Sequence, residues 1–334
     1  MQQIRDLSFE FLAGAGAPAT AVAFGRDVWI ANPSRRRLAL LVPPGGVEAE
    51  TRDSERTAMN VVWGFLIVAA VTAVGVTALL LVRRRAPEGG FFEDGDRAAG
   101  VFGVLATGFS VLLGFIVFLA FTSYDQSRSG AEEEALILVQ QVENAQFFPP
   151  PAARELTGEL VCYGRSVVNG EWDRMRAGTQ GDALNPWGVR LFRTLQSVRP
   201  RSATEQSAYD KWLDQTSTRE QARNDRIHGA VGVIPTTLWI VLFFVAGVIF
   251  VFTLFFADRG ERAVVQGVLI GSVVSVITVL MLLLYGLDNP FHSGVGGLQP
   301  TAMERSLRIT DEALGAVNKQ VQLPCNAQGE PLSR

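Results

Sequence analysis

Two long apolar stretches carry small and hydroxyl side chains at helical spacing, and these residues are candidates for a chemical role. Residues three or four positions apart share one face of a helix, so each set forms a continuous stripe. A narrow surface of hydroxyl and backbone groups is able to line a pore for weakly hydrated ions. The two stripes consist of Gly103, Thr107, Ser110 and Gly114 and of Gly267, Gly271, Ser275 and Thr278.

Close helix packing is the more common reason for such stripes, because small residues let two membrane helices approach each other. That interpretation stays open for both. For pore lining we favour the stripe that includes Thr107 and Ser110, because its helix continues beyond the membrane and could form a vestibule. Ser123 to Arg128 contains no proline, and apolar residues at Ala131, Ala135 and Leu138 follow at helical spacing.

The elements that position these stripes are membrane helices. Of the 334 residues, 48% are hydrophobic, and they are concentrated in four blocks, each long enough to cross a bilayer as a helix. We predict spans at residues 61–82, 101–122, 235–257 and 263–287, and therefore an all-α integral membrane protein with four transmembrane helices. None of these spans contains Asp, Glu, Lys, Arg or His. This argues against a proton relay, a voltage sensor or an ion-coupled transporter.

The four spans divide the chain into five expected segments. They are residues 1–58, an unstructured N-terminal extension; 59–122, the first transmembrane hairpin; 123–234, a helical extramembrane insert between spans two and three; 235–288, the second hairpin; and 289–334, a tail with one short helix. Met59 directly precedes the first span, so we hypothesise that it is the native start.

The insert is predicted to be a bundle of helices built on the extensions of spans two and three. The three prolines from Pro149 to Pro151 end the first helix, and the next one breaks near Gly170. Asn185 followed by Pro186 is a cap and first-turn pair. Ser202 begins a capping-box sequence that starts the last helix.

Charged residues near the membrane surface are expected to form structural ion pairs. Arg223 and Arg226 lie three positions apart on one helix face and are able to pair with the group Glu132 to Glu134. An ion filter is the alternative. Asp288 is expected to cap the turn after span four.

Few residues are available for catalysis, cofactors or metals. The chain has two cysteines and two histidines, too few for a structural zinc site, and lacks the common nucleophile and phosphate-loop motifs. We therefore predict no enzyme activity and no cofactor. Cys162 and Cys325 share a compartment in any four-span topology, and two unpaired thiols are favoured over a disulfide. A net charge of −3 without a basic face argues against nucleic-acid binding.

The expected location is the plasma membrane. Arginines in the two short loops place those loops in the cytoplasm and the insert and termini outside it. Three arginines just before span three, Arg219, Arg223 and Arg226, argue for the opposite orientation.

A set of residues spread over the insert and its flanks resembles an uncharacterised bestrophin-like family of four-span membrane proteins. The order and spacing of the set carry the resemblance, which covers roughly residues 60–310. The residues are Tyr124, Asp125, Glu134, Glu171, Trp172, Arg223, Arg226, Pro235, Trp239, Asp288, Pro290 and Phe291.

The resemblance implies a distant likeness to bestrophins, which are oligomeric anion channels with four helices per subunit and a large cytosolic helical region. A homo-oligomeric ion channel in the lipid bilayer, with an inorganic anion as its ligand, is therefore the first functional hypothesis. The second is a non-conducting scaffold or sensor whose insert binds a protein or envelope partner. A pore between subunits needs a closed ring, whereas a scaffold does not.

Overall fold

The computed structural model describes residues 21–24, 27–30, 39–40, 46–179, 185–316 and 321–332. The chain divides into two compact units, Met1–Ala58 and Met59–Arg334.

Three short strands belong to the first unit. β1 (Ala21–Phe24), β2 (Asp27–Ile30) and β3 (Ala39–Leu40) form an antiparallel sheet in that order. The expectation that residues 1–58 are unstructured was therefore wrong for the residues of these three strands. Strands of two to four residues are too short to leave a clear alternating pattern in the sequence.

The second unit contains four helices long and apolar enough to cross a membrane: α1 (Gly46–Arg83), which begins within the first unit, α2 (Gly95–Ala145), α7 (Thr236–Leu254) and α8 (Ala263–Asp288). The prediction of an all-α membrane protein with four spans is confirmed. In the sequence, the spans were visible as uninterrupted apolar runs of sufficient length.

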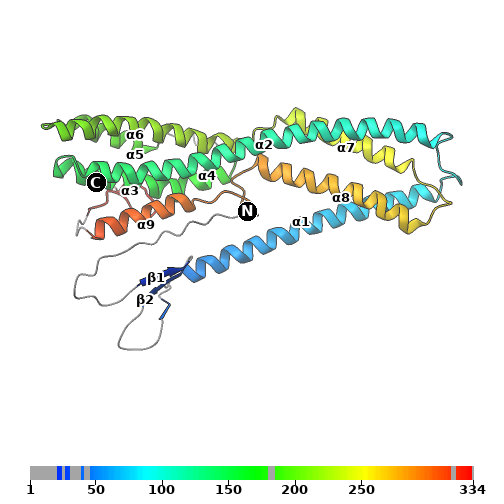
Figure 1. The fold of residues 1–334 in the computed structure, drawn as a ribbon, viewed down its shortest axis with the longest axis horizontal. Helices are drawn as coiled ribbons and strands as arrows, with labels where there is room; N and C mark the ends of the chain where they lie inside the picture. The colour runs from blue at the N-terminus through cyan, green and yellow to red at the C-terminus, as the bar shows by residue number, and fades with distance from the viewer. Residues whose placement is uncertain are drawn as a thin grey trace, which may run out of the picture. The chain divides into compact units, whose positions relative to one another are not determined.

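Helix α2 is the longest element and extends from the membrane region into the insert. Its 51 residues form one helix that is roughly 75 Å long at 1.5 Å per residue. Asp94 caps its first turn, where the side chain accepts a hydrogen bond from the backbone N–H of Arg97 at 3.0 Å. The predicted continuation of span two beyond the membrane is therefore present (Figure 1).

The insert folds as helices that pack on the outer half of α2, and α6 runs alongside α2 (Figure 1). Gly130 permits the close approach of these two helices, because a Cβ atom there would lie 2.5 Å from the backbone nitrogen of Arg226. The insert elements are α3 (Pro150–Ser166), the π-helical turn η1 (Val167–Glu171), α4 (Trp172–Arg176), α5 (Pro186–Ser197), α6 (Ala203–His228) and the 3-10 turn η2 (Gly229–Val231). Helix α9 (Thr301–Ala316) from the tail completes this extramembrane bundle.

The predicted helix starts in the insert are present with their caps. The side chain of Asn185 accepts a hydrogen bond from the N–H of Trp187 at 3.0 Å. Ser202 Oγ accepts from the N–H of Glu205 at 3.1 Å. Both contacts satisfy backbone donors that a helix leaves unpaired at its first turn.

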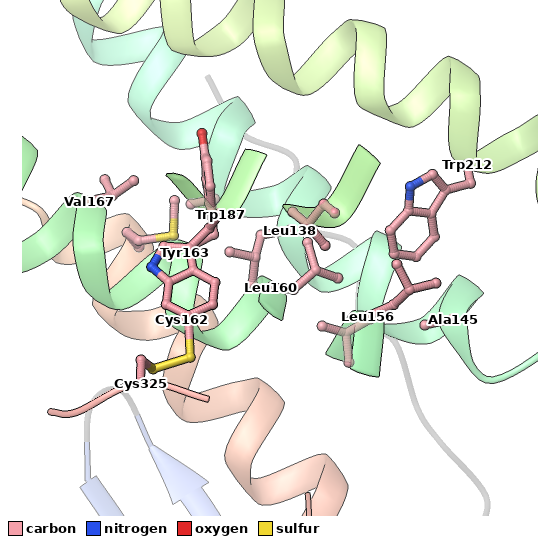
Figure 2. Packing of buried hydrophobic residues seen from close by; sticks show 14 of the residues in the cluster. Leu138, Ala145, Leu156, Leu160, Cys162, Tyr163, Val167, Trp187, Trp212 and Cys325 are labelled. Carbon is pink, nitrogen blue, oxygen red and sulfur yellow. A yellow bond between two sulfur atoms is a disulfide. The ribbon is translucent and has the colours of Figure 1, made fainter. Parts of the chain in front are cut away.

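The core of the extramembrane bundle lies between α2, α3, α5 and α6. It is formed by large apolar side chains that are nearly or fully buried, among them Leu138, Leu156, Leu160, Trp187 and Trp212 (Figure 2). Burying such side chains provides the apolar driving force that the polar sequence of the insert otherwise lacks.

A disulfide bond links Cys162 on α3 to Cys325 in the C-terminal segment, which we define as residues 321–332 (Figure 2). The two Cα atoms are 5.8 Å apart, within the usual range for a disulfide. The favoured interpretation of two unpaired thiols was therefore wrong. The two cysteines are 163 positions apart, and sequence spacing alone does not reveal that the tail folds back onto α3.

Candidate functional site

The stripe on α8 packs against α1. The hydroxyl groups of Thr72 and Ser275 lie 2.8 Å apart, and a Cβ atom on Gly271 would lie 3.3 Å from a methyl group of Val76. At Gly267 the corresponding distance to Val76 is 3.7 Å. These contacts are helix packing within one protomer, made through side chains of α1.

Thr278, the last member of that stripe, is half-buried. Its hydroxyl group donates a hydrogen bond to the carbonyl of Val274 in its own helix at 2.8 Å. Because this hydrogen bond is made to the backbone of its own helix, the hydroxyl group of Thr278 needs no acceptor from a second helix.

The stripe on α2 is exposed. Gly103, Thr107, Ser110 and Gly114 all lie on the surface of the protomer, and among the described residues a Cβ atom on either glycine would meet nothing within 4 Å. An adjacent face of α2, which includes Phe109 and Leu113, is buried in an apolar cluster with α7 and α8. The two stripes therefore differ: one faces a helix of its own chain, and the other faces away from its own helical bundle.

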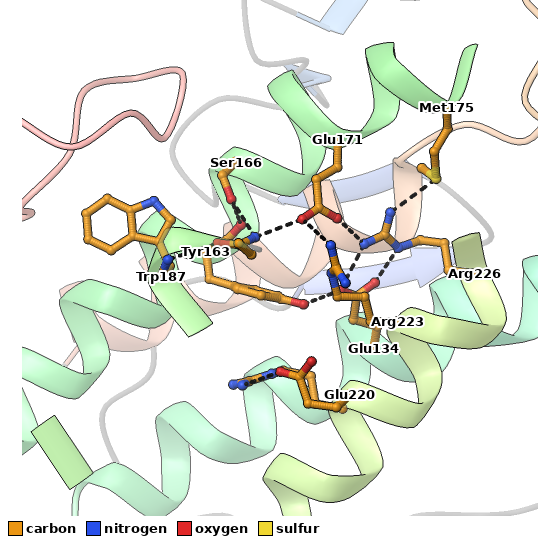
Figure 3. Close-up of polar contacts among 11 residues, drawn as sticks. Glu134, Tyr163, Ser166, Glu171, Met175, Trp187, Glu220, Arg223 and Arg226 are labelled. Carbon is orange, nitrogen blue, oxygen red and sulfur yellow. Dashed lines mark hydrogen bonds and ion pairs between the residues drawn. The ribbon is translucent and has the colours of Figure 1, made fainter. Parts of the chain in front are cut away.

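A buried ionic network joins α2, α3, η1 and α6 in the extramembrane bundle (Figure 3). Arg226, which is fully buried, donates from Nε to Glu134 at 2.5 Å and from Nη2 to Glu171 at 2.6 Å. Tyr163 Oη donates to Glu134 at 2.5 Å, and Arg223 donates to Glu171 at 3.1 Å. We call these five residues the buried network.

The electrostatics of the buried network favour fixed charges. Burial by itself raises the pKa of Glu171, but Arg226 and Arg223 together lower it below its usual value. Burial lowers the pKa of Arg226, and the two carboxylates raise it above its ordinary value. Burial and the neighbouring Glu134 raise the pKa of Tyr163. Each of these shifts favours the ordinary protonation state of its group at neutral pH. We therefore interpret the network as a set of ion pairs that holds the helices together, rather than as a path for protons.

The predicted pairing of the arginines with the group Glu132 to Glu134 is present only in part. Arg226 contacts Glu134 as expected, whereas Arg223 contacts Glu171. Glu132 instead pairs with Arg128 on the exposed surface of α2. Of the three glutamates, only Glu134 lies on the face of α2 that the bundle buries.

A second buried polar layer, which we did not predict from the sequence, lies one step further along the same helix pair. Arg219 donates to Gln141 at 2.6 Å, and its guanidinium lies over the ring of Tyr163 at 4.9 Å. The sequence contains a signal for this layer. Arg219 lies seven residues before Arg226, and Gln141 lies seven residues after Glu134, as expected for two antiparallel helices that meet along one seam.

We predicted that Asp288 caps the turn after span four. This was wrong, because Asp288 caps the start of α7 instead. One carboxylate oxygen accepts from the backbone N–H groups of Val233 and Ile234 at 2.8 and 2.9 Å, and the other accepts from Trp239 Nε1 at 3.2 Å. Pro235, the N-cap residue of α7, makes no side-chain capping bond. A carboxylate from the neighbouring span therefore supplies the missing acceptor.

Asp288→Ala is expected to lower the free energy of unfolding by about 1–2 kcal/mol, because several hydrogen bonds to one carboxylate are lost. Asp288→Asn retains an oxygen acceptor for the two backbone donors, so its loss is expected to be smaller. Thermal unfolding of the detergent-solubilised protein measures both. Equal losses for the two substitutions would contradict this role.

Other residues of the family-like set hold the loop after α8 against the insert. Trp172 donates from Nε1 to the carbonyl of Leu298 at 3.1 Å, and its ring meets that of Phe291 edge-on at 5.4 Å. Tyr124 Oη donates to the carbonyl of Gly296 at 2.8 Å.

The remaining two residues of that set differ in their surroundings. Pro290 is buried, and its carbonyl accepts a hydrogen bond from Leu298 N at 2.7 Å, whereas Asp125 is exposed on α2. Across the described ranges, no three His, Cys, Asp or Glu side chains are grouped so as to hold a metal ion.

These features define a four-span helical membrane protein whose second span continues into an extramembrane helical bundle. The chain belongs to the Bestrophin-like family, since its sequence matches the Bestrophin-like domain over residues 92–303. A search of curated proteins gives no match to this chain.

Solved membrane proteins share the fold. A bacterial bestrophin homologue from Klebsiella pneumoniae, carrying a point mutation, is 13% identical, with a TM-score of 0.56 over 73% of this chain and 98% of that chain. A crystal structure described as a membrane protein is 15% identical, with a TM-score of 0.56 over 77% of this chain and 99% of that one. At these identities the likeness shows the fold alone.

Proposed function

We propose that this protein is a homo-oligomeric anion channel of the cell membrane, with the small-residue stripe of α2 facing the pore. Membership of the Bestrophin-like family supports a membrane protein of the ion-channel kind. The observation that carries the proposal is the different surroundings of the two stripes. Of the two stripes, only the α2 stripe is exposed in the protomer, on a helix that packs against α7 and α8 through a different face.

Subunits arranged around a rotation axis would place the α2 stripes of neighbouring copies face to face. Thr107 and Ser110 would then present hydroxyl groups to the axis, and Gly103 and Gly114 would keep it wide enough for an ion. Gly267, Gly271 and Ser275 of the α8 stripe already contact α1, so we do not assign that stripe to the pore.

For the orientation, we propose that the extramembrane bundle lies outside the cytoplasm. The disulfide between Cys162 and Cys325 supports this, because disulfides persist in oxidising compartments. The short loops on the opposite side of the membrane support it as well. Arg83 and Asp258 meet there, with Arg83 Nε donating to the Asp258 carbonyl at 3.0 Å, and the positive-inside rule places such arginine-rich loops in the cytoplasm.

Single-channel recording in a planar bilayer under a chloride gradient tests the proposal. Purified protein is expected to give unitary currents that reverse near the chloride potential. Thr107→Leu and Ser110→Leu are each expected to lower the unitary conductance severalfold, because leucine fills the space at the axis.

Ser272→Leu is the matched control. Ser272 is also an exposed membrane serine, and like Ser110 its hydroxyl group donates to its own helix backbone, but it lies on α8. Unchanged conductance in both α2 variants would place the pore elsewhere. Silence from a monomeric preparation would favour the non-conducting scaffold or sensor, and native mass spectrometry determines the subunit number.

A further inference from the structure

A large open cleft lies in the extramembrane bundle between α3, α5 and the C-terminal segment. Its volume is about 1100 Å³, of the order of small-molecule sites. Its lining includes Arg154 and Glu159 from α3, Arg190 and Thr194 from α5, and Pro324 from the C-terminal segment. Pro324 precedes Cys325, so the disulfide to Cys162 fixes this wall of the cleft against α3.

Glu159 is a buried carboxyl group with one unused oxygen. The residue is 5% exposed, and Oε1 accepts a hydrogen bond from Thr194 at 3.2 Å. Oε2 is buried and has no hydrogen-bond partner among the described residues. A buried polar atom without a partner is costly, and a bound ligand that supplies the partner would remove this cost.

Three arginines line the same cleft as this carboxyl group. The guanidinium of Arg190 lies over the ring of Trp187 at 4.7 Å, which fixes its position. Arg154 and Arg193 are exposed at the rim. Within the described part of the chain, none of the three forms an ion pair.

We propose that this cleft binds a small soluble organic anion with at least two carboxylate groups, which contacts Arg154, Arg190 and Arg193 and hydrogen-bonds to Glu159. The inference goes beyond the channel proposal and does not depend on it. Guanidinium groups match the planar geometry of carboxylates. Because α3 and α5 each contribute guanidinium groups to the cleft, a ligand with two anionic groups is able to contact both helices at once.

The charges around the cleft favour an anion over a cation. Helix α3 contributes Arg154, Glu155 and Glu159, and α5 contributes Arg190 and Arg193. The lining residues of the C-terminal segment are uncharged: Gln322, Leu323, Pro324 and Leu332. With three arginines against two carboxyl groups, the cleft is net positive even when both carboxyl groups are ionised.

The position of the cleft argues against a lipid headgroup. The part of α2 beyond residue 122 extends roughly 35 Å from the predicted end of the span to Ala145. Helix α3 begins at Pro150, close after that distal end, and the cleft is lined by its first turns, so the cleft lies well away from the bilayer surface.

Protonation of Glu159 is expected to accompany binding. Burial raises its pKa to about 7; the hydrogen bond from Thr194 and the charge of Arg190 oppose this rise, and Glu155 adds to it. The neutral carboxyl group is able to donate its proton to a carboxylate, whereas the ionised form repels it. Affinity for the anion is therefore expected to fall as the pH rises through this pKa.

Isothermal titration calorimetry of the purified full-length protein with succinate tests the proposal. Succinate remains almost fully ionised from about pH 6.5 to about pH 8, so any change in affinity arises in the protein. We expect saturable binding that weakens about fivefold to tenfold across this range, following the protonated fraction of Glu159. Glu159→Gln keeps a hydrogen-bond donor without a titrating group, and is expected to bind equally well at both pH values.

The double variant Arg154→Gln/Arg193→Gln is expected to weaken binding at least tenfold, by removing two charge-assisted contacts. Arg199→Gln is the matched control, since Arg199 is an exposed arginine just after α5 and does not line the cleft. Absence of saturable binding to folded protein would overturn the proposal. So would affinity that rises with pH, unchanged binding by the double variant, or tighter binding of inorganic phosphate than of succinate.

Discussion

Arg226→Met is expected to lower the free energy of unfolding by about 3–5 kcal/mol, the largest effect among these substitutions. Arg226 is fully buried and contacts both Glu134 and Glu171. Methionine fills much of the same volume but leaves Glu134 without a cation. Glu171 keeps Arg223 as a cationic partner and the side-chain amide of Asn185 as a hydrogen-bond donor. Removing one member of a buried ion pair is costly because the remaining charge has lost its hydration without compensation.

Arg128→Met is the matched control. Arg128 pairs with Glu132 on the surface of α2, where both side chains are 60% exposed, so its loss is expected to be at most about 1 kcal/mol. Unfolding followed by tryptophan fluorescence reports on the relevant region, because the Arg226 guanidinium lies 5.7 Å from the Trp172 ring. Arg226→Lys retains the charge and is expected to fall between the two. Equal stabilities for Arg226→Met and the control would show that the buried network does not stabilise the fold.

Replacement of either cysteine of the disulfide by serine is expected to lower the free energy of unfolding by about 2–4 kcal/mol. The bond joins residues 163 positions apart, and closing so long a loop restricts the unfolded chain strongly. Cys162→Ser, Cys325→Ser and the double variant are expected to lose the same amount, since each removes one and the same bond. Wild-type protein treated with dithiothreitol should match them.

The wild-type protein is expected to migrate faster on a non-reducing gel than after reduction, and the variants are expected not to change. Complete labelling of both thiols in protein purified without reductant would contradict the bond. That result would also remove the main support for an extracytoplasmic bundle. If the disulfide is present but the cysteine variants remain as stable as the wild-type protein, its role would be limited to holding the C-terminal segment against α3.

Local features of the fold could be predicted from the sequence because they depend on neighbours in the chain. The spans are continuous apolar runs, and the uninterrupted helix from span two into the insert follows from the absence of a stop signal after Thr122. The caps at Asn185 and Ser202 depend on residues two and three positions away. Part of the buried network was also predictable, because the contact between Glu134 and Arg226 joins adjacent faces of two extended helices.

Contacts between distant segments could not be predicted in the same way. Asp288 caps α7 only because the end of α8 lies beside the start of α7, and Glu171 meets Arg223 only because η1 packs against α6. The cleft around Glu159 needs the C-terminal segment as its third wall. No spacing along the chain encodes these distances.

The two small-residue stripes show the difference between the two levels most directly. The sequence by itself determined that both stripes form continuous helix faces, since 3.6 residues per turn place every third or fourth residue on one side. Only the tertiary structure decided that the α8 stripe packs against α1 while the α2 stripe remains exposed. The physical reason is that helical periodicity follows from the chain's own backbone, whereas the partner of a face depends on how separate helices pack.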